Sequence, residues 1–262
     1  MKHLIVLSII VILAHAASRA PAQAPEALHL KAATAKIDIT PPAGTPVVGH
    51  VRKVSGVRDP IQAVLLLLDD GRTKAAIITL DLVNAPTEMT QRLRSAIGMS
   101  AGVPPENIMV ATSHNHSGPG WSQNEAWNHQ AERDIAAAAK KAAGQMRSVS
   151  IGYQEDAIDF NINRRQTIGG RSLVRLNPDG PCDHRVKVLR LDDGQSPEPL
   201  AVVMHAVCHP CVFTWGDKWS PPYPGGYPKM SADFPGEAKA FVEKAYDGRT
   251  TALFLQGCAG DI

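Results

Sequence analysis

The strongest pattern along the chain is a series of short apolar runs, each ending in polar or glycine-rich residues. The segments QAVLLLLDDG (62–71) and TKAAIITLDLV (73–83) predict two buried strands with an Asp-Asp-Gly turn between them. A second Asp-Asp-Gly turn separates VKVLRL from PLAVVMHAVCH, which indicates another pair of strands. Further strands are predicted at KIDIT, ENIMVATS, SVSIGYQE and TALFLQ.

Helical spacing interrupts the strands in three places. Residues 86–102 place Met89, Leu93 and Ile97 four apart, with Thr87 as the expected N-cap. The Ala-rich segment 124–146 predicts a long helix, and a third helix is expected to begin near Pro235. Helices alternate with strands in the first half of the chain, and hairpin-like strand pairs also occur. We therefore expect an α/β fold with mixed β-sheets flanked by helices in a single domain.

Residues 1–24 have the pattern of a secretory signal peptide. Lys2 provides a cationic start, residues 4–13 are apolar apart from Ser8, and Ala14-His15-Ala16 offers a small-x-small cleavage site. The apolar run is short for a membrane span, although an uncleaved anchor is the alternative. We expect residues 25–262 to form an exported domain, periplasmic or secreted. The chain stops just after the glycine-rich turn in ALFLQGCAGDI, so we expect this domain to be incomplete at its C-terminus.

Composition and charge narrow the classes of function. The 262 residues carry a formal net charge of +2, which provides no basic field for nucleic acid, so a nucleic-acid partner is not expected. No P-loop, dinucleotide-binding fingerprint or Gly-x-Ser-x-Gly elbow occurs in the sequence. The oligomeric state stays open.

Four cysteines leave several possibilities open. Cys208 and Cys211 form a C-x-x-C, which could be a small disulfide, a redox pair or half of a zinc site. The residues after Pro210 do not read as the start of a helix, which disfavours a thioredoxin-like role. Export permits disulfides, but the pairing of Cys182, Cys208, Cys211 and Cys258 cannot be deduced from the sequence.

Two histidine-bearing segments follow predicted strands. In ATSHNHSGPG, His114 and His116 lie two residues apart, so on an extended segment both would project to one side. In VVMHAVCHP, His209 is expected at the tip of a strand that ends at Pro210, with His205 further back as a packed side chain or as a support behind a ligand. Imidazole nitrogen suits zinc, and two strand tips could converge on one metal. A hydrogen-bonded polar loop is the alternative for the first segment.

Four other polar residues stand in unusual places. Asp81 interrupts an apolar strand, where it could orient a metal-bound histidine or cap a neighbouring loop. Arg164, in DFNINRRQ, could hold a substrate oxygen or belong to a surface turn. Asp261 lies in a glycine turn after the last strand, and Asp233 precedes a helix, where an N-cap role is the default.

Taken together, these segments resemble the neutral/alkaline non-lysosomal ceramidase family. The similarity rests on IDITPPAGTP, GVRDPIQA, ITLDLV, SHNHSGPG, NINRR, the His-Pro after an apolar strand, and GCAGD, in this order over residues 33–262. SHNHSGPG is the most specific of them. The family consists of secreted or membrane-associated zinc amidases that hydrolyse the N-acyl bond of ceramide.

The resemblance implies roles for particular residues. His114 and His209 would be ligands of zinc (Zn²⁺), while His116 would face the scissile amide and Arg164 would lie near its carbonyl. Apart from the resemblance, the sequence offers Asp81 and Asp261 as candidates to support these residues from behind. The family completes its zinc site with a Glu and a Tyr from further along the chain, beyond Ile262. A lipid or small-molecule substrate and peripheral contact with a membrane would follow. The alternatives are a non-catalytic metal-binding module and a hydrolase of the same fold acting on a non-lipid amide or ester.

Overall fold

Strand β2 (Gln62–Asp69) lies at the centre of the molecule, and both of its faces are buried. The computed structural model describes residues 29–48, 54, 56–121, 124–213 and 229–262. Ala63, Leu65 and Leu67 of β2 face one apolar cluster, while Val64 and Leu66 face another. A strand covered on both sides needs no polar face, which explains the unbroken run of apolar residues.

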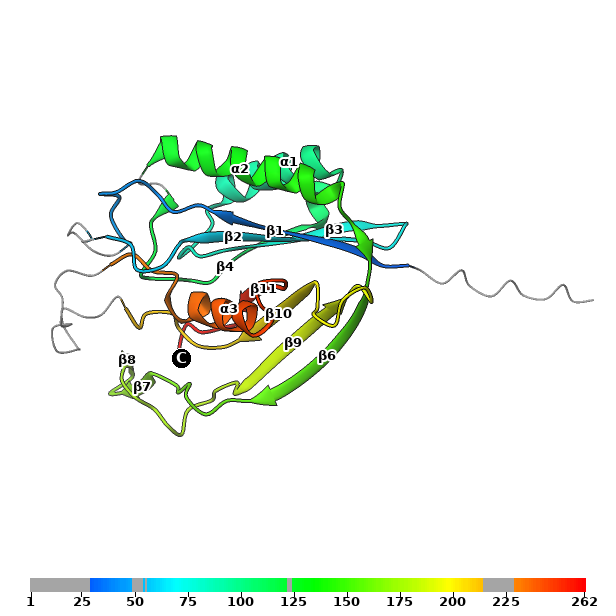
Figure 1. Ribbon diagram of the computed structural model, residues 1–262. Coiled ribbons are helices and arrows are strands. Elements are labelled where there is room, and N and C mark those ends of the chain that lie inside the picture. The colour runs from blue at the N-terminus through cyan, green and yellow to red at the C-terminus, as the bar shows by residue number, and fades with distance from the viewer. Residues whose placement is uncertain (1–28, 49–53, 55, 122–123, 214–228) are drawn as a thin grey trace, which may run out of the picture.

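The strand β2 belongs to a five-stranded sheet. The order is β4 (Ile108–Thr112), β3 (Lys74–Leu80), β2, β1 (Lys31–Asp38) and β5 (Arg147–Ser148). Strands β3 and β4 are parallel, whereas β1 pairs with β2 and β2 with β3 in antiparallel fashion. The first face is covered by α1 (Thr87–Ala101) and α2 (Glu125–Ala143), which lie side by side above the sheet (Figure 1).

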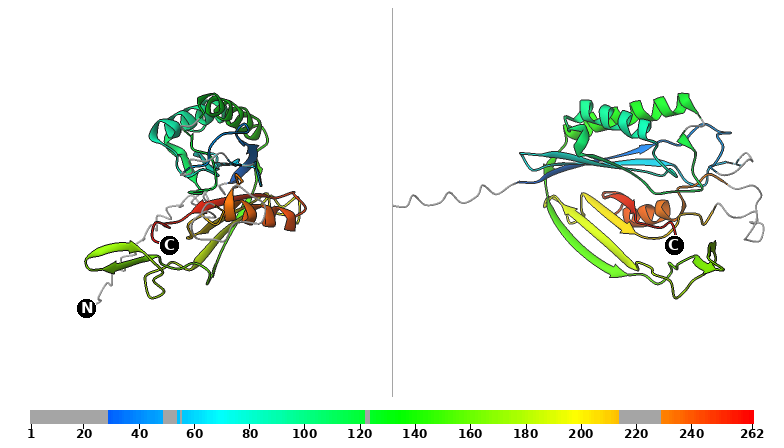
Figure 2. Two further views of the ribbon diagram at one scale, coloured as in Figure 1. Left: turned by 90° about the vertical axis from the view of Figure 1, so that its left-hand side faces the viewer. Right: turned by 180° about the vertical axis from the view of Figure 1, so that it is seen from behind.

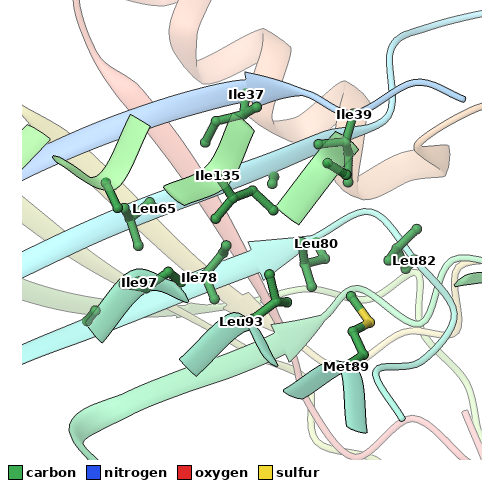
Figure 3. Packing of buried hydrophobic residues seen from close by; sticks show 14 of the residues in the cluster. Ile37, Ile39, Leu65, Ile78, Leu80, Leu82, Met89, Leu93, Ile97 and Ile135 are labelled. Atoms are coloured by element: carbon green, nitrogen blue, oxygen red, sulfur yellow. The ribbon is translucent and has the colours of Figure 1, made fainter. Parts of the chain in front are cut away.

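The two helices cover the sheet with regularly spaced apolar side chains. In α1, Met89, Leu93 and Ile97 are buried at intervals of four residues, as the sequence predicts. Figure 3 shows Leu93 and Ile97 near Ile78 of the sheet and Met89 near Leu80 and Leu82; Ile135 of α2 belongs to the same cluster. The short run 105–107 between α1 and β4 is a 3-10 turn.

A second, four-stranded sheet packs against the opposite face of the first. Its order is β11 (Thr251–Gln256), β10 (Ala201–Ala206), β9 (Arg185–Asp192) and β6 (Ser150–Ala157). Strands β10 and β11 are parallel and the other pairs are antiparallel. Helix α3 (Asp233–Ala245) packs against β11, where the rings of Phe234 and Phe254 lie 5.6 Å apart (Figure 2). A small hairpin, β7 (Arg165–Ile168) and β8 (Arg171–Val174), extends from this half.

The expected fold class is confirmed: mixed sheets are flanked by three helices in an α/β arrangement. Three local predictions are wrong. Pro86, not Thr87, is the N-cap of α1, because a proline without an N–H is well placed just before the first turn. Helix α3 begins at Asp233, so Asp233 is not its N-cap. Strand β10 ends at Ala206, which leaves His209 in the following loop and not at a strand tip.

Two further observations concern membranes and export. No helix in the described part of the chain is long and apolar enough to cross a membrane. The predicted signal peptide, residues 1–24, lies outside the described residues.

Candidate metal centre

Two parallel strand pairs, one from each sheet, end at the same place. The chain leaves β4 and reaches His114 two residues later, and it leaves β10 and reaches His209 three residues later. Loops at the carboxyl ends of parallel strands are where α/β proteins commonly place ligands. The structure brings His114, His116 and His209 together there, with one ligating atom from each within 4.8 Å of the others.

Main-chain carbonyls orient two of the three imidazoles. The Nδ1–H of His114 donates to the carbonyl oxygen of Val83, 2.9 Å away, in the loop after β3. Nδ1 of His209 lies 2.9 Å from the carbonyl oxygen of Ala259, in the loop after β11. Each histidine is therefore held by the loop of the neighbouring parallel strand. A proton on Nδ1 leaves the Nε2 lone pair facing the cluster, as in many metal-ligating histidines.

The spacing of the Nε2 atoms fits a metal ion. Nε2 of His116 lies 3.2 Å from that of His114 and 3.0 Å from that of His209. Nitrogen ligands about 2.0–2.1 Å from a tetrahedral zinc are about 3.3 Å apart. Burial, reinforced by the neighbouring imidazoles, lowers the pKa of His116 to about 4, and burial also lowers the pKa of His209. At least these two rings are neutral at pH 7, which is the form that binds metal.

The His-x-His segment is not extended, contrary to the prediction. His114 has φ = +59°, a left-handed conformation, so the two rings meet across a turn. Asn115, fully buried, stabilises this turn: its Nδ2 donates to the carbonyl oxygens of Asp81 and Ser231, and its Oδ1 accepts from the N–H of Ser117. A Cβ at Gly118 would lie 2.8 Å from the Asp81 carbonyl oxygen, so this position requires glycine.

A buried carboxylate, Asp233, connects the loops of the histidines. Its oxygens accept hydrogen bonds from the Ser117 hydroxyl at 2.9 Å and from the N–H groups of Val212 and Phe213 at 3.3 and 3.1 Å. Ser117 is adjacent to His116, and Val212 is three residues after His209. The side chain is fully buried and φ is +56°, so the conformation at Asp233 is held by these contacts.

We predict that Asp233→Asn weakens metal binding by about 10- to 100-fold, the range seen when groups behind metal ligands are changed. The new amide hydrogens would oppose N–H donors, and the two loops would separate. Asparagine tolerates a positive φ, so the backbone conformation is not the cause. Chelator competition would measure the zinc affinity. Asp247→Asn is the matched control, because Asp247 is exposed and has φ = +53°. Equal affinity in the two variants would contradict the positioning role.

Arg164 lies against the histidine cluster. Its Nη2 is 2.8 Å from Nδ1 of His209 and 3.3 Å from the carbonyl oxygen of Gly260. A single ring nitrogen cannot both donate to Ala259 and accept from Arg164, so these two contacts of His209 exclude each other. Burial lowers the pKa of Arg164, opposed in part by nearby thiols.

The remaining predicted residues lie behind the cluster. Asp261 accepts from Nδ2 of Asn163 at 3.2 Å, and its carbonyl oxygen accepts from the N–H of Arg164 at 2.7 Å. The Asp81 carboxylate contacts Lys239 and the N–H of Gln62, and carbonyl groups take the orienting role considered for it.

Other candidates from the sequence remain apart from the cluster. His205 is partly buried with its Nδ1 unpartnered in the described structure. Cys182, Cys208 and Cys258 are thiols, and burial raises the pKa of Cys208 to about 11, so this thiol is protonated. A low-pKa nucleophile of the thioredoxin type is therefore not formed at Cys208.

Sequence reasoning missed the groups that hold the site together. The carbonyl groups of Val83 and Ala259 carry no sequence signal, because every residue has one. Asn115 and Lys239 were detectable only as polar residues in apolar surroundings. Asp233 was noticed, but as a helix cap.

Comparison with known proteins identifies the fold. No family model matches the sequence, and no curated protein matches it. The neutral ceramidase from Pseudomonas aeruginosa has a similar structure, with a TM-score of 0.70 and 18% identity over 90% of this chain and 39% of the ceramidase chain. A ceramidase complexed with C2 gives a TM-score of 0.67 and 18% identity over 89% and 38% of the two chains. The chain has a ceramidase-like fold and spans less than half the length of these proteins.

Proposed function

We propose that this chain carries the metal-centred site of a hydrolase that cleaves an N-acyl amide bond, in ceramide or a related acylated molecule, with zinc as the metal. The observation that carries the proposal is the convergence of three imidazoles at ligand spacing. The similarity in fold to two ceramidases supports the choice of reaction. We further propose that the enzyme acts outside the cytoplasm, in keeping with the N-terminal sequence pattern.

His114 and His209 are the proposed zinc ligands, because their rings are oriented by main-chain carbonyls. The ring of His116 has no such acceptor in the described structure and is left to face the substrate. Bound zinc would supply Lewis acidity toward the scissile carbonyl and a nucleophilic water at neutral pH. With the Nε2 atom of His209 occupied, its Nδ1 would carry the hydrogen, and this N–H would donate to the carbonyl oxygen of Ala259. Arg164 then loses its ring acceptor and can donate to the oxygen of the substrate, where negative charge develops.

We predict that Arg164→Gln retains zinc but lowers turnover by about 10²- to 10³-fold, the usual effect of removing one donor to a developing oxyanion. Zinc content by mass spectrometry and kcat on N-hexanoylsphingosine would be measured together. Arg175→Gln is the control, since Arg175 is exposed nearby. Parallel loss of zinc and activity in Arg164→Gln would instead assign this arginine a structural role.

Substrate profiling tests the function itself. N-hexanoylsphingosine, an N-acyl amino sugar, an N-acyl peptide and an aryl ester would be offered to the chain with and without added zinc. Zinc-dependent hydrolysis of N-hexanoylsphingosine would support a ceramidase-like activity. Faster hydrolysis of another compound would identify that compound's class as the substrate class. Metal binding without hydrolysis of any of them would contradict the proposal and favour a non-catalytic module.

A further inference from the structure

Two adjacent arginines lie beside the metal centre, and no carboxylate among the described residues lies within ion-pair distance of either. Arg164 and Arg165 both direct an Nη2 at the carbonyl oxygen of Gly260, at 3.3 and 3.2 Å. The Asp261 carboxylate, in the loop after β11, acts electrostatically on Arg164 but is hydrogen-bonded to Nδ2 of Asn163 at 3.2 Å. The two positive charges thus share the neutral oxygen of Gly260, and Arg164 has in addition only the neutral ring of His209 as a partner of its Nη2 in the described structure.

Each of these guanidinium groups also has a buried donor without a partner. Nε of Arg164 and Nη1 of Arg165 are inaccessible to solvent and make no hydrogen bond in the described structure. Leaving a buried charged donor unpaired is costly, and proteins commonly relieve that cost with a ligand.

We propose that the arginine pair (Arg164 and Arg165) forms a subsite for an oxyanion, so that the acylated substrate carries a carboxylate or phosphate close to its scissile amide. This rests on the proposed function. Arginine suits such a group because its planar fork donates two parallel hydrogen bonds to a carboxylate or phosphate. A divalent ion held by His114 and His209 would add to the positive charge and favour an anionic over a neutral substrate. Arg164 would serve the reacting carbonyl, and Arg165 would select for the charge.

The test compares three substrates that differ only in the head group: N-octanoylglycine, N-octanoyl-O-phosphoethanolamine and the neutral N-octanoylethanolamine. The wild-type chain is expected to show a higher kcat/KM for at least one anionic compound than for the neutral one. Arg165→Gln should reduce that preference by about 10- to 100-fold, the value of a hydrogen bond to a charged group. Zinc content should stay unchanged. Arg171→Gln, an exposed arginine on β8, is the matched control and should keep the preference.

A second measurement separates this inference from the proposed function. Metal-free protein would be titrated calorimetrically with the same three compounds, so that binding is seen without hydrolysis. Preferential binding of an anionic compound that Arg165→Gln abolishes supports the subsite even if none of the compounds is hydrolysed. Tighter binding of N-octanoylglycine would indicate a carboxylate subsite, and tighter binding of N-octanoyl-O-phosphoethanolamine would indicate a phosphate subsite. Equal binding and hydrolysis of all three, unaffected by Arg165→Gln, would overturn the subsite while leaving the hydrolase intact.

Discussion

The His114→Ala variant is expected to lose stoichiometric zinc, and with it hydrolysis should fall by about 10³-fold or more. His114 supplies one of the three converging Nε2 atoms, and the Val83 carbonyl fixes its ring orientation. Removing it leaves His209 as the one proposed zinc ligand among the described residues, and a single imidazole is too little to hold the ion. Zinc content by mass spectrometry, beside the wild-type chain, measures the first effect, and amide hydrolysis measures the second.

Two further variants guard this result. Alanine at φ = +59° adds about 1 kcal/mol of strain, so His114→Asn, which tolerates that conformation, separates metal loss from misfolding. His116→Ala is expected to retain zinc with reduced turnover, because both carbonyl-anchored rings remain. If His114→Asn bound zinc as the wild type does, the assignment of the metal centre would be wrong.

The Lys239→Met variant is expected to lower the free energy of unfolding by about 3–5 kcal/mol. Nζ of Lys239 lies 2.8 Å from both carboxylate oxygens of Asp81, and the two side chains are 3% and 4% exposed. Burial raises the pKa of Asp81, and the positive charge of Lys239 opposes that rise. Removing the lysine therefore leaves a buried carboxylate without a counter-ion. The pair joins α3 to the loop after β3, and urea unfolding would record the loss.

The matched control uses the same replacement on the same helix. Lys244→Met removes an exposed lysine of α3 and should change stability by no more than about 0.5 kcal/mol. The Asp81 carbonyl oxygen also accepts from Asn115, so Lys239→Met should weaken zinc binding as well. Similar unfolding curves for both variants would show that the ion pair contributes little.

Sequence periodicity was sufficient to predict the helices and strands whose side chains are buried at regular intervals. The four-residue spacing in α1 and the unbroken apolar run of β2 each correspond to a buried surface of one kind, so local pattern and tertiary environment agree. It failed where the chain leaves regular structure. The sequence does not indicate that β10 ends at Ala206, because the apolar run continues to Val207. The strand ends where its pairing with β9 and β11 stops, and hydrophobicity does not report that point.

The sequence by itself determined the α/β class, the candidate histidines and the absence of signatures for nucleotide chemistry, because these depend on residue type and spacing. Only the tertiary structure decided that His114 and His209, from different sheets, meet with His116 at ligand distance. It also decided that carbonyls and not Asp81 orient the rings, and that Asp233 links the loops. Such contacts join segments that are far apart in the sequence, as for Ser117 and Asp233, which are 116 residues apart, and local patterns carry no information about them.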